Sequence, residues 1–223
     1  MPTPNKGTLI AEGAYTYQHG DTSTGHETWR LDKLAHGGLV FTSRIELTSP
    51  NTATLNLTFE ATQSWAPVRF SARLDAAGRT LTSEQRTAGG QWQARIEPRG
   101  EPAQELALDF GAKHEVESAS PVFLTATLFR QNLQVGQSRE VDAILIDSTT
   151  FAPHAAKLKY TCVAEEKIEV PAGQFAAWHY TANDDHFWAD RNGVVLLYQS
   201  STGDTMRLAR YRRIERRQQE GGR

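Results

Sequence analysis

The chain has 223 residues, which is enough for one large domain whose hydrophobic core needs neither disulfides nor a structural metal. Hydrophobic residues make up 39% of the chain and charged residues 22%, which is typical of a folded globular protein and excludes extensive disorder. The formal net charge of −2 gives no overall positive field to attract nucleic acid or an anionic membrane, and a single cysteine excludes an intrachain disulfide.

The N-terminal stretch MPTPNKGTLIAEG contains no apolar run long enough for a signal peptide. No segment approaches the roughly 20 apolar residues of a membrane-spanning helix. We therefore expect a cytoplasmic protein without a membrane span, although a secretory signal already removed from the chain stays an alternative. No stretch has the composition of an interdomain linker, so we expect one domain over residues 1–217 and a disordered tail over 218–223.

Strand signals dominate the first half of the chain. AYTYQHG places Tyr15 and Tyr17 on one face, and ETWRLDKL places Trp29 and Leu31 on one face. The alternation of apolar and polar residues is strict in three later runs, which contain Leu55, Leu57 and Phe59; Val68, Phe70, Ala72 and Leu74; and Trp92, Ala94 and Ile96. This pattern predicts strands of a sheet with one buried face and one face in water.

The segment Ser118–Leu133 has helical rather than strand periodicity. Ser120 is a candidate N-cap and Pro121 occupies the first helical position. An apolar stripe follows at helical spacing, formed by Val122, Leu124 or Thr125, Leu128, Phe129 and Leu133. We predict one amphipathic helix here.

Strands resume in REVDAILID and KLKYTCVAEEKIEV, and the second of these makes Cys162 a buried, inert thiol. Regular helices between strands are missing, which favours a meander over βαβ units. The predicted fold class is therefore all-β with one short helix: a large antiparallel meander sheet rolled into a half-barrel or β-roll.

The stretch VPAGQFAAWHYTANDDHFWADRNGVVLLY, residues 170–198, predicts two hairpins. Its Val-Pro-Ala-Gly-x-Phe turn, aromatic strand, FWADRNGVVLLY run and following hairpin resemble the C-terminal part of several bacterial β-rich families of unknown function. These include lipoprotein-carrier-like and glycolipid-binding families, in which a large antiparallel sheet rolls partly around itself. The resemblance covers about Ile168–Tyr211. It implies the architecture and an apolar ligand, and it brings no catalytic residues.

Five tryptophans occur in the chain, and core packing of a curved sheet is the simpler explanation for them. The alternative is that they line an apolar pocket. The candidate ligand-binding residues are Trp29, Trp178, His179, Trp188 and Tyr198.

Asp184, Asp185, His186 and Asp190 lie close together in the sequence. Histidine and carboxylate are normal metal ligands, but NDD and DRN are also what hairpin turns use, and no known metal-binding spacing is present. We therefore favour turn chemistry and expect no metal and no cofactor.

Arginines cluster near the end of the chain, where Arg207, Arg210, Arg212, Arg213, Arg216 and Arg217 stand against Glu215. They are able to contact phosphates, but charge on an edge strand also blocks strand pairing, and no nucleic-acid recognition motif accompanies them. We expect no nucleic-acid partner.

These observations favour a non-enzymatic binding module for an apolar or lipid-like small molecule in the interior of the curved sheet, with the helix Pro121–Leu133 plugging one open end. The first alternative is a hydrolase or isomerase whose site joins His179 and His186 to Asp185 or Asp190. If these side chains lie together in one place, the enzyme hypothesis is favoured; if they lie apart at the loop tips, the binding module is favoured. A dimerising structural protein is a third hypothesis, and the sequence predicts no oligomeric state.

Overall fold

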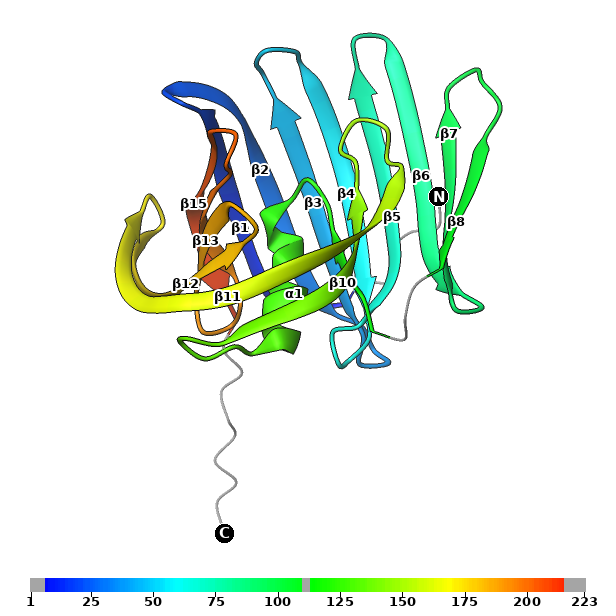
Figure 1. Cartoon of the computed structure of the whole chain (residues 1–223). Coiled ribbons are helices and arrows are strands. Elements are labelled where there is room, and N and C mark those ends of the chain that lie inside the picture. The colour runs from blue at the N-terminus through cyan, green and yellow to red at the C-terminus, as the bar shows by residue number, and fades with distance from the viewer. Residues whose placement is uncertain (1–6, 110–112, 215–223) are drawn as a thin grey trace.

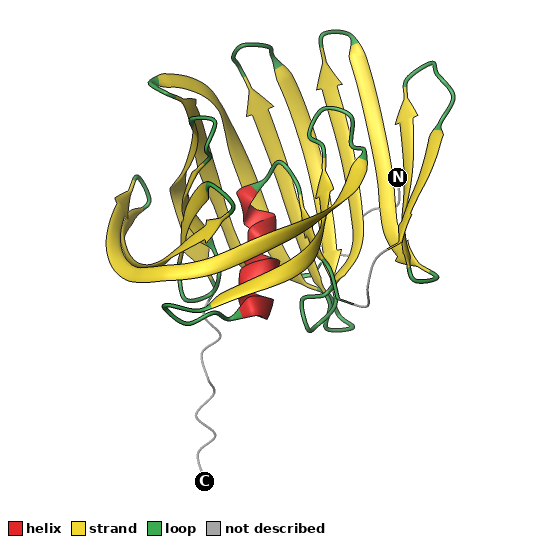
Figure 2. Cartoon of the chain, in the orientation of Figure 1, coloured by secondary structure: helices red, strands yellow, loops and turns green. Residues whose placement is uncertain are grey.

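The structure, a computed structural model, describes residues 7–109 and 113–214. Within these residues fifteen strands form one sheet, and one short helical segment packs against it (Figures 1 and 2). The strands are β1 (Thr8–His19), β2 (Thr22–Lys33), β3 (Leu39–Leu47), β4 (Ala53–Ala61), β5 (Pro67–Ala76), β6 (Arg79–Ala88), β7 (Gln91–Pro98), β8 (Gln104–Asp109), β9 (Glu115–Glu117), β10 (Ser138–Ile146), β11 (Pro153–Val170), β12 (Gly173–Ala182), β13 (Asp185–Ala189), β14 (Val195–Gln199) and β15 (Asp204–Arg213). The helical segment is a 3₁₀ turn, Pro121–Phe123, followed by the α-helix α1, Leu124–Gln131.

The order of the strands in the sheet is β8-β7-β6-β5-β4-β3-β2-β1-β15-β14-β13-β12-β11-β10-β9. Two meanders, β1–β8 and β10–β15, are joined where β1 pairs with β15. The two edge strands, β8 and β9, follow one another in the chain. The predicted fold class, an all-β protein with one short helix and a large rolled antiparallel sheet, is confirmed. One detail differs: β9 and β10 pair in parallel, because α1 lies between them in the chain.

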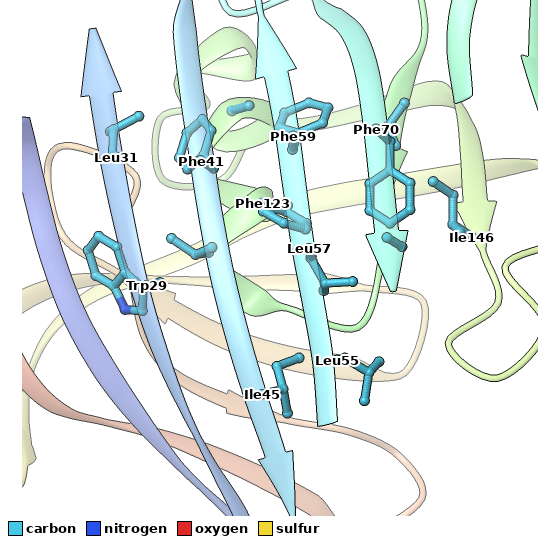
Figure 3. Packing of buried hydrophobic residues seen from close by; sticks show 14 of the residues in the cluster. Trp29, Leu31, Phe41, Ile45, Leu55, Leu57, Phe59, Phe70, Phe123 and Ile146 are labelled. Atoms are coloured by element: carbon cyan, nitrogen blue, oxygen red, sulfur yellow. The ribbon is translucent and has the colours of Figure 1, made fainter. Parts of the chain in front are cut away.

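The helical segment occupies the concave side of the sheet. In Figure 2 it lies between the strands of the first meander and strands β10 and β11. Phe123 packs into the first meander, with its ring centroid 5.5 Å from that of Phe59 and 6.2 Å from that of Phe41 (Figure 3). Leu128 packs against the second meander in a cluster that includes Tyr160. The helix therefore fills the interior between the two arms, and the expectation that it plugs an open end is wrong.

Period two along the strands predicted most of the core correctly. Leu55, Leu57 and Phe59 are buried on β4, and Trp92, Ala94 and Ile96 are buried on β7. Cys162 is also buried, as predicted, and burial raises the pKa of its thiol.

Two predicted core residues are exposed. Val68 turns outward because the register between β4 and β5 shifts at Glu60 and Ala61. Phe129, predicted on the buried stripe of the helix, is 49% exposed. Leu128 and Leu133 of the same stripe are buried. Phe129 lies in the last turn of the helix, where it stacks on Trp65 at the surface.

The largest buried side chain on the sheet, Trp92, gives the first prediction. Its indole is fully buried, and its Nε1 donates a hydrogen bond to Gln85 Oε1 at 2.7 Å. We expect Trp92→Ala to lower the free energy of unfolding by about 3–5 kcal/mol, because it leaves a cavity in a packed core. Urea unfolding measures this loss, and Trp188→Ala, which removes a half-buried indole, is the control with a smaller effect. Equal losses for the two variants contradict the prediction.

Candidate functional site

Strand alternation separates the residues that the sequence suggested as ligand contacts. Across β12 and β13, His179 pairs with Trp188 and Tyr180 pairs with Phe187. Neighbouring residues in a strand point to opposite faces, so His179 and Trp188 share the face opposite to that of Trp178. Trp178 packs beside the buried cluster around α1, and it is half-buried.

Tyr198 and Trp29 lie elsewhere. Tyr198 packs on the inner cluster, and its hydroxyl donates a hydrogen bond to Asp185. Trp29 is a core residue of β2, only 3% exposed, with its ring stacked on Tyr15 at a centroid distance of 6.1 Å. The five candidate residues thus form no common site. Both tryptophans of the β12–β13 hairpin are half-buried, whereas Trp92 is fully buried.

The two histidines of the enzyme hypothesis do meet. His179 Nε2 lies 2.9 Å from His186 Nδ1, and Glu166 Oε1 lies 3.4 Å from His179 Nδ1. The His179 ring stacks on Trp188 at 4.4 Å, and Trp188 Nε1 donates to Glu166. Burial lowers the pKa of His179, as does the neighbouring His186, while Glu166 opposes the shift. The ring nitrogens face each other at hydrogen-bond distance, so one ring is able to donate to the other, and no room is left for an ion between them.

The aspartates of that hypothesis do not join the histidines. Asp190 Oδ1 accepts hydrogen bonds from the backbone N–H groups of Asn192 (2.8 Å) and Val194 (3.0 Å), which confirms the predicted turn role. Asp185 accepts from Tyr198 on the opposite face. Across the described parts of the chain, no group of three or more His, Cys, Asp or Glu side chains is arranged to hold a metal ion.

A large groove lies at the C-terminal end of α1. Its volume is about 930 Å³, and its walls are the β4–β5 loop (residues 63–66), residues 113–115, the last turn of α1 and the start of β10 (residues 139–142). Trp65 and Phe129 form its aromatic wall, with ring centroids 4.5 Å apart and nearly parallel planes. Trp65 adopts a left-handed backbone (φ 67°), which Thr62 stabilises by accepting the N–H of Trp65 at its carbonyl oxygen. Strained backbone of this kind is concentrated at functional sites.

The opposite wall of the large groove is polar. Glu115, only 3% exposed, accepts hydrogen bonds from Gln131 Nε2 (2.7 Å) and Arg130 Nη1 (3.0 Å). Burial raises the pKa of Glu115 to about 7, and the positive charge of Arg130 opposes that shift. Arg139 Nη1 donates to Gln131 at 3.2 Å. This wall therefore presents fixed hydrogen-bond donors and acceptors beside an aromatic surface.

A small groove of about 300 Å³ lies on the other side of Phe129. Its walls are the last turn of α1, the following loop, Trp178 and Tyr180 of β12, and the β13–β14 turn at Arg191. Phe129 is common to both grooves. Of the five residues that the sequence suggested as ligand contacts, Trp178 lines the small groove, and Asp190 of the enzyme hypothesis lines it too.

A buried polar cluster fixes the position of the helical segment. Glu27, with no exposed surface, accepts hydrogen bonds from the hydroxyls of Tyr17, Ser43 and Ser120. Ser120 also caps the 3₁₀ turn, because its Oγ accepts from Val122 N. Burial raises the pKa of Glu27 to about 7 against the three hydrogen bonds that lower it. The cluster thus links three strands to the start of the helical segment.

Sequence reasoning missed Glu27 and Phe129 as site residues, and it considered Trp65 only as one of five tryptophans able to line a pocket. A signal for Glu27 was present, because it is in phase with Trp29 and Leu31 on the buried face of one strand. No strand alternation singled out Trp65 from the other tryptophans, because it stands in a loop.

Comparisons with known proteins identify the family and the fold of the chain. A family model described as "Putative glycolipid-binding" matches residues 15–202, so the chain belongs to this family. The structure is similar to the crystal structure of a DUF1089 family protein from Pseudomonas aeruginosa (17% identity, TM-score 0.53, covering 78% of this chain and 89% of that one). It is also similar to a beta-barrel-like protein of the domain of unknown function DUF1849 from Brucella abortus (11% identity, TM-score 0.63, covering 94% and 99%). These likenesses show the fold.

No curated protein matches the chain. No helix in residues 7–109 and 113–214 is long and apolar enough to cross a bilayer.

Glu27 gives a prediction for the dependence of stability on pH. Its pKa is raised on folding, so its contribution to stability is complete below about 4.5 and is lost as pH rises through about 7. We expect the free energy of unfolding to fall between pH 5 and pH 8, by on the order of 3 kcal/mol at most from this residue. The raised pKa of Glu115 also lowers the free energy of unfolding as pH rises.

Glu27→Gln tests this prediction, since an amide has nothing to titrate in this range. Denaturant unfolding across the pH range should give a shallower slope for Glu27→Gln than for the native chain. The exposed Glu84→Gln is the control and should keep the native slope. A native slope in Glu27→Gln shows that other groups set the pH dependence.

Proposed function

We propose that the protein is a non-enzymatic binding module for an amphipathic, lipid-like small molecule, held in the grooves on either side of Phe129. The observation that carries the proposal is a large aromatic side chain, 49% exposed, that stacks on Trp65 and forms a wall of two grooves. Exposed apolar surface beside convergent polar groups is typical of a ligand site. Membership of the family described as putative glycolipid-binding supports the same class of ligand.

The apolar part of the ligand packs on the aromatic wall at the mouth of the sheet. Aromatic side chains already fill the concave interior, where Phe41, Phe59 and Phe123 lie in contact. Trp65 extends this aromatic core to the surface, since its ring lies 6.0 Å from Phe41 on one side and 4.5 Å from Phe129 on the other. Trp178 provides a second apolar contact across the small groove.

The polar part of the ligand faces the opposite wall of the large groove. Charged side chains of both signs line this groove, namely Lys113, Arg130, Arg139, Glu115, Glu140 and Asp142. The positive and negative groups balance, so the groove favours an uncharged head group with many hydroxyls over an anionic or cationic one. A sugar head group has this chemistry.

Isothermal titration calorimetry with monomeric n-dodecyl-β-D-maltoside tests the proposal. We expect saturable binding that quenches tryptophan fluorescence, and a loss of about tenfold in affinity for Phe129→Ser, because the alkyl chain loses its aromatic contact. Val163→Ser removes an equally exposed apolar side chain outside the groove walls and should bind as the native chain does.

Two results contradict the proposal. The first is an absence of heat and of quenching at all detergent concentrations below micelle formation. The second is equal affinity in Phe129→Ser and Val163→Ser, which places the binding site away from α1.

A further inference from the structure

Exposed apolar side chains gather at one end of the molecule. Phe129 lies in the last turn of α1, and Val135 lies in the loop that follows the helix; they are 49% and 51% exposed. Ile214, 43% exposed, follows directly after β15. In Figure 1 the end of α1, the loop into β10 and the end of β15 lie along the lower edge of the molecule.

Contacts join these segments into one surface. Gly193 of the β13–β14 turn sits against the end of α1, where an added Cβ would lie 3.5 Å from Leu128 Cβ. Arg191 of the same turn lines the small groove with Phe129. Tyr211 of β15 donates a hydrogen bond to Asp190 of the turn at 3.1 Å. The turn thus connects the helix end to the end of β15.

The charge of this surface is positive. Arg191 and Arg213 are exposed on it, and Arg213 lies beside Tyr211. The nearby carboxylates already have partners. Asp190 accepts the backbone N–H groups of its own turn, and Glu12 forms an ion pair with Arg212 at 2.8 Å. The carboxylates of the large groove are paired with Arg130 and Lys157. The chain as a whole carries a charge of −2, so the positive field is local to this end.

We infer that this end of the molecule is a membrane-docking face, formed by Phe129, Val135, Arg191, Arg213 and Ile214, that binds the surface of an anionic bilayer. Separate apolar side chains on a helix end and loops insert between head groups, and the surrounding guanidinium groups contact lipid phosphates. The inference rests on the proposed function, because the ligand grooves open on the same face and a lipid-like ligand partitions into membranes.

Flotation with ligand-free vesicles tests the inference. The native chain should bind vesicles of phosphatidylcholine with roughly 25% phosphatidylglycerol at about 0.1 M salt, and should dissociate at about 1 M salt. Vesicles of phosphatidylcholine alone should bind it several-fold more weakly. Arg213→Gln should weaken binding to the anionic vesicles about fivefold, and Arg86→Gln, an exposed arginine on β6, should not.

Val135→Ser separates docking from ligand binding, because Val135 lines neither groove. It should weaken vesicle binding several-fold and leave the affinity for dodecyl maltoside unchanged, with Val68→Ser on β5 as the matched exposed control. Equal binding to neutral and anionic vesicles overturns the inference, as does native binding by both Val135→Ser and Arg213→Gln. A concentration-dependent dimer that Val135→Ser dissociates, without vesicle binding, assigns the face to a second copy of the chain and also overturns it.

Discussion

The hydrogen bond from Ser120 to Glu27 joins the helical segment to the sheet. It connects a buried carboxyl on β2 to the residue that starts the helical segment. A buried carboxyl without partners is costly, so withdrawal of the helical segment from the sheet would leave Glu27 with fewer hydrogen bonds in an apolar environment. The cluster therefore favours one docked position of the helix. That position places Phe123 among the aromatic rings of the concave face and brings the end of α1 to the mouth of the sheet.

The filled interior explains why the candidate site lies at the rim. A rolled sheet of this length is able to enclose a ligand, but here the helix and its aromatic neighbours take that space. Phe129 lies at the surface end of this packed interior and is half-exposed. It is too large to be covered by the last turn of the helix and it stacks on Trp65, whose left-handed backbone turns the indole toward the groove. The two grooves are the surfaces left on either side of that contact.

The sequence predicted the buried residues of individual strands, which follow from the alternation of side chains. It missed the groove, which depends on contacts between distant segments. Alternation is a property of each strand, so Trp92, Ala94 and Ile96 were assigned correctly to the core. The same alternation places Trp178 and His179 on opposite faces. From the sequence, we grouped the two residues in one site without applying this alternation. The exposure of Phe129 depends on which loops reach the end of the helical segment, and that has no local signal. The groove unites segments that lie far apart in the chain.

The strand order has a consequence for how the chain is made. β1 and β15 pair near the middle of the sheet, although, among the strands of residues 7–109 and 113–214, β1 is synthesised first and β15 last. During synthesis the first meander is able to form while its β1 edge has no partner, and such an edge is open to pairing with other chains. Closing this pair brings together the most distant strands of the sequence, and contacts of this kind slow folding. The nascent chain therefore depends on protection of that edge until its final strand is complete.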